Sequence, residues 1–297
     1  MPLRAEDLPD WKKFKVLNGY FIGDIFMRAD LHIHTTASDG TWDPSQVVEA
    51  VCRAGIKLFA ISDHDSVANV AETERLAENE GLKFITGVEL NSTKDGHNYH
   101  ILGYGIDVEN KNLGELCRHN QKLLEQKDDD SVRNLIDRGW PLSMEEFKKY
   151  TYDPHRGGWK ALAYLQDKGL CGDVNDFFRR IFTAENNLGF PDFPSIAEVV
   201  QVIHKAGGIA LCAHLASDFH GAGMQEYLPR LADEKLDGFE CFHSGHSAED
   251  SRLLAHFCHR HKLYISGGSD CHGSFVPSRH LGIPEVDSNS LYLPWLQ

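Results

Sequence analysis

Short apolar runs alternate with amphipathic segments along the chain from about residue 26 onward. Runs such as "FMRADLHIH", "IKLFAISD" and "LKFITGVELNS" are typical of buried strands. The segment "DPSQVVEAVCRAG" predicts a helix with Asp43 as its N-cap and Pro44 at its first position. A second helix is expected at "SVANVAETERLAENEG", and "HNYHILGYGID" predicts a strand that forms a hairpin around Asp95 and Gly96.

The pattern changes after Asp107. Residues 110–190 are polar and mostly helical in pattern, and we interpret them as an inserted helical subdomain that caps the substrate. Alternation resumes with a helix at "SIAEVVQVIHKAGG" and strands at "IALCAHL", "LDGFECFH" and "LYISGGSD". We therefore expect an α/β fold whose parallel sheet or barrel uses residues 26–109 and 191–297, preceded by an N-terminal extension (1–25).

The composition is that of an ordinary globular protein, with 41% hydrophobic and 25% charged residues in a chain of 297. Its seven cysteines are scattered and form no CxxC pair, which favours reduced thiols in a cytoplasmic protein. No signal peptide and no membrane-spanning run is predicted. The formal net charge of −14 disfavours binding to long nucleic acids, although bound cations would still allow an anionic substrate.

Residue types that bind metal ions follow one predicted strand after another. Side chains alternate along a strand, so His32 and His34 should point to the same side. The full set in chain order is His32, His34, Asp39, Asp63, His64, Asp65, Glu89, His100, His214, Asp270 and His272. Burying so many titratable groups together is costly unless opposite charge compensates them. Several divalent cations would provide that compensation.

Five motifs, in this order, resemble the polymerase and histidinol phosphatase (PHP) family of metal-dependent phosphoesterases. They are "DLHIHTTASDG", "ISDHDS", "GVEL", "CAHL" and "GGSDCHG". The resemblance covers residues 28 to about 107 and 195 to about 284, on both sides of the expected insertion. It implies a distorted (β/α)7 barrel with a trinuclear metal centre at the carboxyl ends of the strands.

The resemblance also implies which residues bind each ion. His32, His34, Glu89 and Asp270 should hold the first ion. Glu89 should bridge to a second ion, which His100 and His214 complete, and Asp39, His64 and His272 should hold the third. Asp63 and Asp65 are expected to support these ligands, with Asp65 orienting His64 or capping the next helix. The nitrogen and oxygen ligand set suits manganese, iron or zinc, and the family favours manganese.

The activity implied by the resemblance is hydrolysis of a phosphate monoester by a metal-bound hydroxide. An aspartate at position 39, together with the insertion, is similar to the branch that acts on 3',5'-nucleoside bisphosphates or RNA 5' ends. We therefore expect a phosphatase of small nucleotides. Three alternatives stay open: a 5'–3' exonuclease on short oligonucleotides, a non-catalytic metal- or nucleotide-binding module, and a hydrolase of carbon–nitrogen bonds.

Substrate contacts are expected from two segments. In "YDPHRGGWKAL", His155, Arg156 and Lys160 lie near a predicted helix start, where cations and free N–H groups favour an anion. Similar proteins usually have Pro-His after the arginine, whereas this chain has Gly157 and Gly158. In "ECFHSGHS", two further candidates follow a predicted strand, namely His243 and His246. We expect His243 to contact either the substrate phosphate or a metal ligand.

Overall fold

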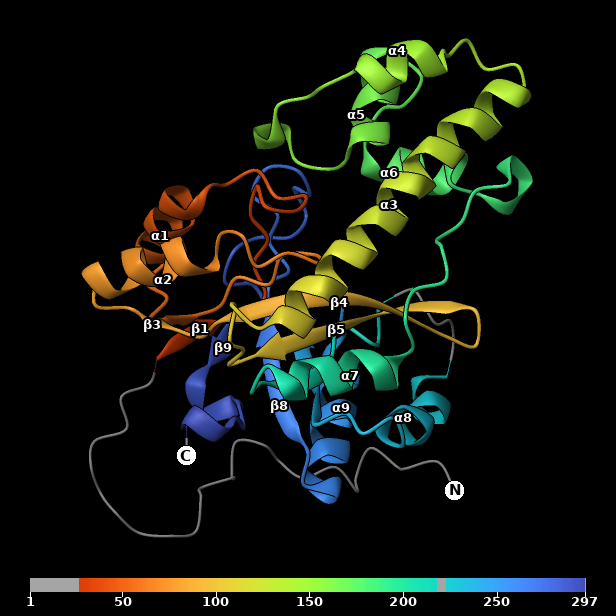
Figure 1. The fold of residues 1–297 in the computed structure, drawn as a ribbon. Coiled ribbons are helices and arrows are strands. Elements are labelled where there is room, and N and C mark those ends of the chain that lie inside the picture. Colours follow the sequence, from red (N-terminus) through yellow and green to blue (C-terminus); the bar gives the residue numbers. More distant parts are fainter. Residues whose placement is uncertain (1–26, 218–222, 297) are drawn as a thin grey trace, which may run out of the picture.

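The computed structural model describes residues 27–217 and 223–296, so the predicted N-terminal extension (1–25) lies outside the described residues. The described chain is a mixed α/β fold whose strands form two sheets (Figure 1). The first sheet has the order β3-β2-β1-β9, with bounds Lys83–Phe84, Leu58–Phe59, Arg28–Asp30 and Val286–Asp287. The second has the order β4-β5-β6-β7-β8, with bounds Gly87–Lys94, His97–Tyr104, Ile209–Cys212, Gly238–His243 and Tyr264–Gly268.

The hydrogen-bonded sheets of the described chain do not close into the expected (β/α)7 barrel. Pairing is parallel within β1–β2–β3 and β6–β7–β8, but antiparallel wherever β5 or β9 takes part. The two sheets meet through single bridges, Ile33 with Cys271 and His64 with Glu89. Beyond β8 the chain leaves the extended conformation, since Asp270 has a φ of 55°.

Several strands are shorter than predicted. The segment "LKFITGVELNS" is divided between β3 and β4, and β1 ends at Asp30, so His32 and His34 follow the strand instead of lying within it. Their segment still pairs with the chain beyond β8, since the N–H of His34 donates to the carbonyl of Cys271 over 2.8 Å. A Cβ atom at Gly268 would lie 2.4 Å from the backbone nitrogen of His32, so glycine is needed for this close approach.

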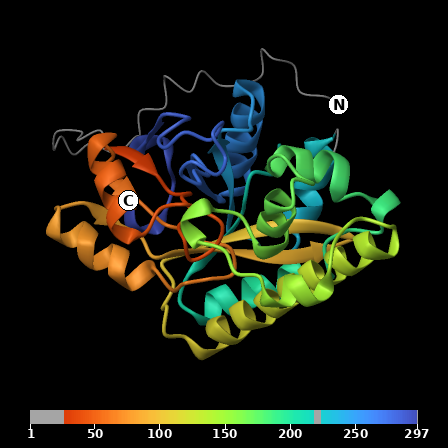
Figure 2. The same ribbon diagram turned by 90° about the horizontal axis from the view of Figure 1, so that it is seen from above.

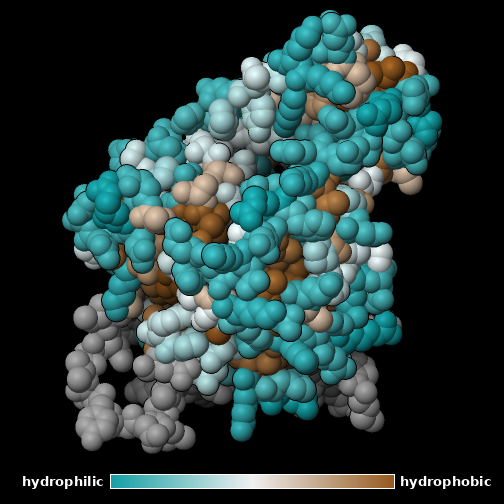
Figure 3. Space-filling view, viewed as in Figure 1, coloured by the Kyte–Doolittle hydropathy of each residue, from teal (hydrophilic) through white to brown (hydrophobic). Residues whose placement is uncertain are grey.

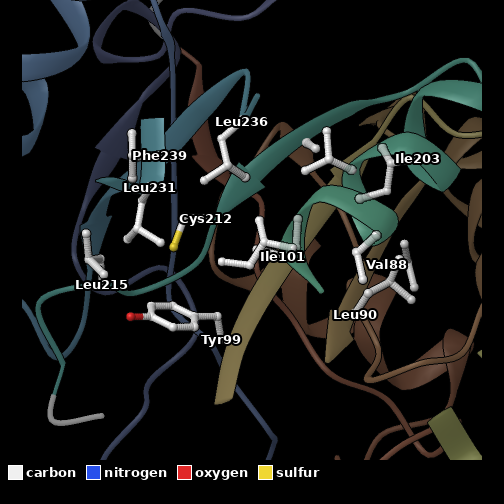
Figure 4. Close-up of a cluster of buried hydrophobic side chains, with 14 of the residues drawn as sticks. Val88, Leu90, Tyr99, Ile101, Ile203, Cys212, Leu215, Leu231, Leu236 and Phe239 are labelled. Carbon is white, nitrogen blue, oxygen red and sulfur yellow. The ribbon is translucent and has the colours of Figure 1, made fainter. Parts of the chain in front are cut away.

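The predicted hairpin is confirmed. β4 and β5 form an antiparallel ladder from Gly87 to Tyr104, and the turn between them has φ values of 52° at Asp95 and 76° at Gly96. Val88 and Leu90 on β4 and Ile101 on β5 pack with Ile203 of helix α7 (Ile196–Lys205) in the largest apolar cluster (Figure 4). Each such side chain stabilises the fold by about 1.5–3 kcal/mol when fully buried.

Helices of the α/β rhythm cover the sheets. Their bounds are α1 Pro44–Arg53, α2 Val70–Asn79, α7 Ile196–Lys205, α8 Met224–Ala232 and α9 Ala248–His261. As predicted, Asp43 caps α1, and its carboxylate and Gln46 form a capping box. Helix α2 begins at Val70, later than the sequence pattern predicts, and its N-cap Asn69 makes no side-chain capping bond.

A second group of helices lies between β5 and α7. These are α3 (Lys111–Asp137), α4 (Met144–Lys149), α5 (Lys160–Asp167) and α6 (Val174–Asp176), with short turns η3 (Pro154–Arg156), η4 (Phe177–Ile181) and η5 (Ala184–Asn186). The start of α3 packs with α7, whereas its far end, with α4 and α5, projects away from the sheets (Figures 1 and 2). There Leu135, Leu162, Phe177 and Ile181 form a separate apolar cluster. Two short turns, η6 (Ser288–Ser290) and η7 (Pro294–Leu296), end the described chain.

The surface is mainly hydrophilic, and the face seen in Figure 3 shows hydrophobic residues only in small separate patches. Among residues 27–217 and 223–296, no helix combines the length and apolar character that crossing a membrane requires.

Candidate metal centre

Candidate ligand side chains converge at one end of the two sheets. They form three groups, and within each group the ligand atoms lie within 4.8 Å of one another. The groups are His32, His34, Glu89 and Asp270; His64, Glu89 and His100; and His34, Asp39, His64 and His272. Because Glu89, His34 and His64 each belong to two groups, the three groups form one continuous cluster.

The first group is fully enclosed by protein. Glu89 on β4 and Asp270 after β8 approach from opposite strands, and both side chains are buried. Oε2 of Glu89 lies 3.2 Å from Nε2 of His32 and 3.2 Å from Nε2 of His34. Oδ1 of Asp270 lies 3.1 Å from Nε2 of His34. These are the four residues that the sequence predicted for the first ion.

His100 of the second group faces the other oxygen of Glu89, as does His214, which is not a member of the three groups. Oε1 of Glu89 lies 3.2 Å from Nδ1 of His100 and 3.1 Å from Nε2 of His214. The expected partners are therefore together. His64 also faces Glu89, with Nδ1 at 3.1 Å from Oε2, which the sequence did not predict.

The third group surrounds Asp39 in the loop after β1. Its Oδ1 lies 3.3 Å from Nε2 of His272 and 3.5 Å from Nδ1 of His34. The rings of His34 and His64 are 4.5 Å apart, so His34 joins the predicted trio of Asp39, His64 and His272. In the fold, the loop after β1 lies against the loop after β8 because Thr41 N–H donates to the carbonyl of His272 over 3.2 Å.

Hydrogen bonds fix which ring nitrogen of two histidines is free to bind a cation. Nδ1–H of His32 donates to Oε1 of Glu240 over 2.9 Å, so Nε2 is the ring nitrogen that faces the first group. Nδ1–H of His272 donates to the backbone carbonyl of Asp270 over 2.8 Å, so its bare Nε2 faces Asp39. Both partners are of the kind that orients histidines toward metal ions.

The residues fit divalent cations. Four ligand atoms are buried without a hydrogen-bond partner: Oδ1 of Asp39, Nδ1 of His64, Oε2 of Glu89 and Oδ1 of Asp270. Each of them belongs to one of the three groups. Buried polar atoms are rarely left unpaired, so the convergence of these four atoms is what a site for bound cations requires. Imidazole and carboxylate without thiolate suit first-row transition metals.

The histidines and carboxylates of the cluster shift one another's pKa values. Burial lowers the pKa of His64 to about 3, so its ring is neutral and able to bind an ion. Burial acts against ionisation of Glu89 and Asp270, yet surrounding histidines, and Arg279 beside Asp270, hold both pKa values well below their usual range. Burial likewise opposes protonation of His34, but Asp270, Glu89 and Asp39 raise its pKa to about 10.

Comparison with known protein families shows that residues 30–211 match the PHP domain. The chain belongs to the PHP family. Membership and the clustered ligand atoms identify this PHP protein as a metal-dependent hydrolase of phosphate esters.

Three curated relatives match most of the chain. A 5'-3' exoribonuclease of Haemophilus influenzae is 28% identical over 82% of this chain and 89% of its own length. A 3',5'-nucleoside bisphosphate phosphatase of Chromobacterium violaceum is 28% identical over 86% of this chain and 91% of its own length. A phosphoribosyl 1,2-cyclic phosphate 1,2-diphosphodiesterase of Eggerthella lenta is 27% identical over 86% of this chain and 98% of its own length.

Two solved structures share the fold at 26% sequence identity. One, from Bifidobacterium adolescentis, is described as a metal-dependent phosphoesterase; its TM-score is 0.76, covering 88% of this chain and 93% of that chain. The other, from Chromobacterium violaceum, is described as an amidohydrolase with bound sulfate and no metal; its TM-score is 0.72, covering 85% and 90%.

Asp63 supports the PHP centre by holding the loop that carries Asp39. Its Oδ1 accepts the backbone N–H of Thr35 over 2.7 Å and the hydroxyl of Ser38 over 2.6 Å. Its Oδ2 accepts the Thr35 hydroxyl over 2.7 Å. The carboxylate is fully used by this loop and is not among the ligand groups of the described residues.

Asp65 neither orients His64 nor caps α2, so that prediction is wrong. The side chain turns to α3 and β4 instead, where it accepts N–H groups from Asn120 over 2.7 Å and from the Asn91 side chain over 2.6 Å. The positive φ of Asp65, 47°, redirects the chain there, and Gln121 donates to its carbonyl over 2.8 Å. The residue thus fastens helix α3 beside the His64 loop.

The charged residues predicted in the insertion contact mainly the insertion itself, although His155 also lies 4.0 Å from Asp43, the N-cap of α1. Arg156 pairs with Asp167 over 2.9 Å, and the ammonium of Lys160 lies 4.7 Å from the ring centre of Phe147. His155 is half exposed and lies 3.0 Å from Asp153. None of the three forms an ion pair with a residue of the ligand groups in the described chain.

Instead, the backbone of the next residues reaches the PHP centre. The N–H of Gly158 donates to the carbonyl of Asp39 over 2.8 Å. Gly157 has a φ of 72°, and a Cβ there would lie 2.5 Å from Cβ of Phe275. Gly157 and Gly158, which stand where similar proteins usually have Pro-His, therefore contact both loops that carry candidate ligands.

His243 and His246 have different surroundings. Nδ1 of His243 accepts the N–H of Gly245 over 2.9 Å, so Nε2–H is the donor to Oδ2 of Asp270 over 3.2 Å. His246 uses both ring nitrogens on the backbone, with Ala216 at 3.3 Å and Cys241 at 3.3 Å. His243 therefore supports a ligand, and His246 is held by the backbone.

Two supporting residues were given no role in the sequence prediction. Glu240 is fully buried on β7 among apolar neighbours, and a charged residue inside such a strand was the available signal. Arg279 lies in the loop after β8, where Nη1 is 2.5 Å from Oδ2 of Asp270. No sequence pattern distinguishes it, because its position depends on how that loop folds back.

Proposed function

We propose that this protein hydrolyses a phosphate monoester of a small nucleotide, such as a 3',5'-nucleoside bisphosphate or a mononucleotide, at a centre of three divalent ions. The observation that carries the proposal is the overlap of three ligand groups through Glu89, His34 and His64. One ion in each group, with manganese preferred over iron or zinc, would relieve the unpaired buried atoms.

The ions would supply an activated water molecule and neutralise charge on the phosphoryl oxygens. The chain's own residues provide the frame for this chemistry. The two oxygens of Glu89 face different histidines, Oε2 facing His34 and Oε1 facing His100, so one carboxylate links the groups. Glu240 and the carbonyl of Asp270 fix the ring orientations of His32 and His272. His32, Glu89 and Glu240 are fully buried, so little water reaches this part of the cluster.

The substrate class rests on relatives and on charge. The Chromobacterium violaceum relative is named for nucleoside bisphosphates, and the net charge of −14 disfavours long polyanions. A second candidate is 5'–3' cleavage of short oligonucleotides, because the Haemophilus influenzae relative is named an exoribonuclease. The seven free cysteines favour a reducing compartment, and we propose a cytoplasmic location.

The domain plan is part of the proposal. Residues 26–109 and 191–297 would form the distorted PHP barrel, and residues 110–190 a helical insertion that caps the substrate. The separate apolar cluster around Leu135 and Phe177 supports an insertion with its own core. The bond from Gly158 to Asp39 supports its placement over the ions.

The test is phosphate release by protein purified with Mn²⁺, whose metal content is measured in parallel. The panel holds 3',5'-bisphosphoadenosine, AMP, histidinol phosphate, a short 5'-phosphorylated RNA and an amide substrate. His64→Ala removes a side chain shared by two groups, and His119→Ala, an exposed histidine on α3, is the matched control.

We expect about three ions per chain, phosphate release from the nucleotides, and loss of that activity in His64→Ala alone. Nucleotide products from the RNA would favour the exonuclease. A full metal complement without phosphate release from any ester would contradict the proposal. In that case, cleavage of the amide would indicate a carbon–nitrogen hydrolase, and no turnover at all a binding module.

A further inference from the structure

Arg279 is set apart from the other basic residues by its partner. Its Nη1 lies 2.5 Å from Oδ2 of Asp270, a candidate metal ligand. The other ion pairs of lysine and arginine side chains among the described residues involve carboxylates outside the ligand groups. The Asp270 side chain is 2% exposed, whereas that of Arg279 is 31% exposed. The guanidinium therefore lies beside the cluster and still reaches solvent.

The carboxylate of Asp270 lies between Arg279 and the first ligand group. Its Oδ1 faces the first group, 3.1 Å from Nε2 of His34, and has no hydrogen-bond partner. Its Oδ2 faces Arg279 and His243. A phosphoryl group bound to an ion in the first group would thus lie within reach of the same guanidinium.

Arg279 is not needed merely to satisfy Asp270. Because Nδ1 of His243 accepts from Gly245, its Nε2–H already donates to Oδ2 of Asp270. A guanidinium has five N–H donors, and the contact that the structure gives Arg279's side chain is with this one carboxylate oxygen. The remaining donors form a planar fork that suits phosphate.

We propose that Arg279 is a catalytic residue that binds the phosphoryl group undergoing hydrolysis. It donates to a non-bridging oxygen and stabilises the negative charge that develops there. This proposal rests on the proposed function and adds the phosphate contact that Arg156 and Lys160, held within the insertion, do not supply. Removing such a donor typically lowers turnover by about 10²–10³-fold.

The experiment uses the full chain loaded with Mn²⁺ in three variants. Arg279→Ala removes the guanidinium, Arg279→Lys keeps the charge without the fork, and Arg53→Ala is a control at an exposed arginine paired with Glu49. For each we would measure ions per chain, the Kd for inorganic phosphate by calorimetry, kcat/KM on the best nucleotide, and rescue by added guanidinium.

We expect unchanged ion content in both Arg279 variants. In Arg279→Ala, phosphate binding should weaken at least about tenfold and kcat/KM should fall about 10²–10³-fold, with partial rescue by guanidinium. Arg279→Lys should lie between Arg279→Ala and wild type, and Arg53→Ala should match wild type.

Loss of ions from both Arg279 variants would overturn the proposal, because Arg279 would then be only a counter-ion of Asp270. Unchanged phosphate affinity in Arg279→Ala would overturn it as well. If the wild type hydrolyses no ester, the proposed function fails, but the comparison of phosphate Kd values still decides whether Arg279 binds phosphate.

Discussion

Glu240 and His32 form a fully buried pair in which Nδ1–H of the imidazole donates to Oε1 of the carboxylate over 2.9 Å. The other oxygen of Glu240 accepts the backbone N–H of His214 over 2.8 Å. One carboxylate on β7 thus orients a ligand of the first group and anchors the strand end that carries a candidate for the second.

Glu240→Gln should weaken metal binding about 10–100-fold, the usual effect of losing such an outer partner. The amide keeps one acceptor but loses the charge, and its NH2 group opposes the donor of either His32 or His214. Competition with a chelator measures the affinity. Glu234→Gln, which alters a pair with Lys94 away from the cluster, is the control. Equal affinity in both variants would show that Glu240 does not act on the ions.

Metal binding should depend strongly on pH. Carboxylates raise the pKa of His34 to about 10 in the metal-free protein, so the ring carries a proton at neutral pH. One ring nitrogen of His34 must lose its proton before it can bind an ion. Below this pKa, each fall of one pH unit should therefore weaken metal binding up to about tenfold. Calorimetry in buffers of different ionisation enthalpy should show release of about one proton or more per chain. Binding without proton release would refute this prediction.

The gathering of candidate ligands could be predicted from the sequence, because motifs at successive strand ends come together when strands lie side by side. Which residues form each group was implied by the resemblance to the PHP family. His32, His34, Glu89 and Asp270 lie together as that resemblance implied. Asp43 and the Asp95 turn were also predictable, since capping and hairpin geometry depend on neighbouring residues only.

What sequence could not supply depends on contacts between distant segments. Arg279 reaches Asp270 because the loop after β8 folds back, and Asp65 meets Asn120 because α3 crosses the His64 loop. The residues around Arg156 in the sequence favoured a phosphate contact, but Arg156 pairs with Asp167 at the end of α5. Whether the two sheets close into a barrel likewise depends on how the strand ends bend. The alternation of apolar and polar residues along the chain does not predict that bending.

Gly157→Ala should separate the insertion from the metal loops. The residue has a φ of 72°, and an added Cβ would lie 2.5 Å from Phe275 and 2.8 Å from the carbonyl of Asp39. With a ψ of 176°, this backbone conformation is nearly confined to glycine and costs another residue about 1–3 kcal/mol, and the clash adds to this. We expect a lower melting temperature and a raised KM. Gly139→Ala, with a φ of 84° but no atom near its Cβ, controls for the backbone alone.

Equal KM in the two glycine variants would mean that docking of this segment does not influence substrate binding. A larger KM in Gly157→Ala alone would support the proposed capping role of residues 110–190.

Asp63→Ala should remove one ion and leave the other two. Asp63 holds the loop of Asp39 through Thr35 and Ser38, and the loss leaves the buried N–H of Thr35 unpaired at a cost of about 1–3 kcal/mol. The third group alone depends on Asp39, so its ion should be lost first. Metal analysis after dialysis should therefore give about one ion fewer per chain than in Asp192→Ala, an exposed control. Loss of all ions together would instead show that the three groups bind as one unit.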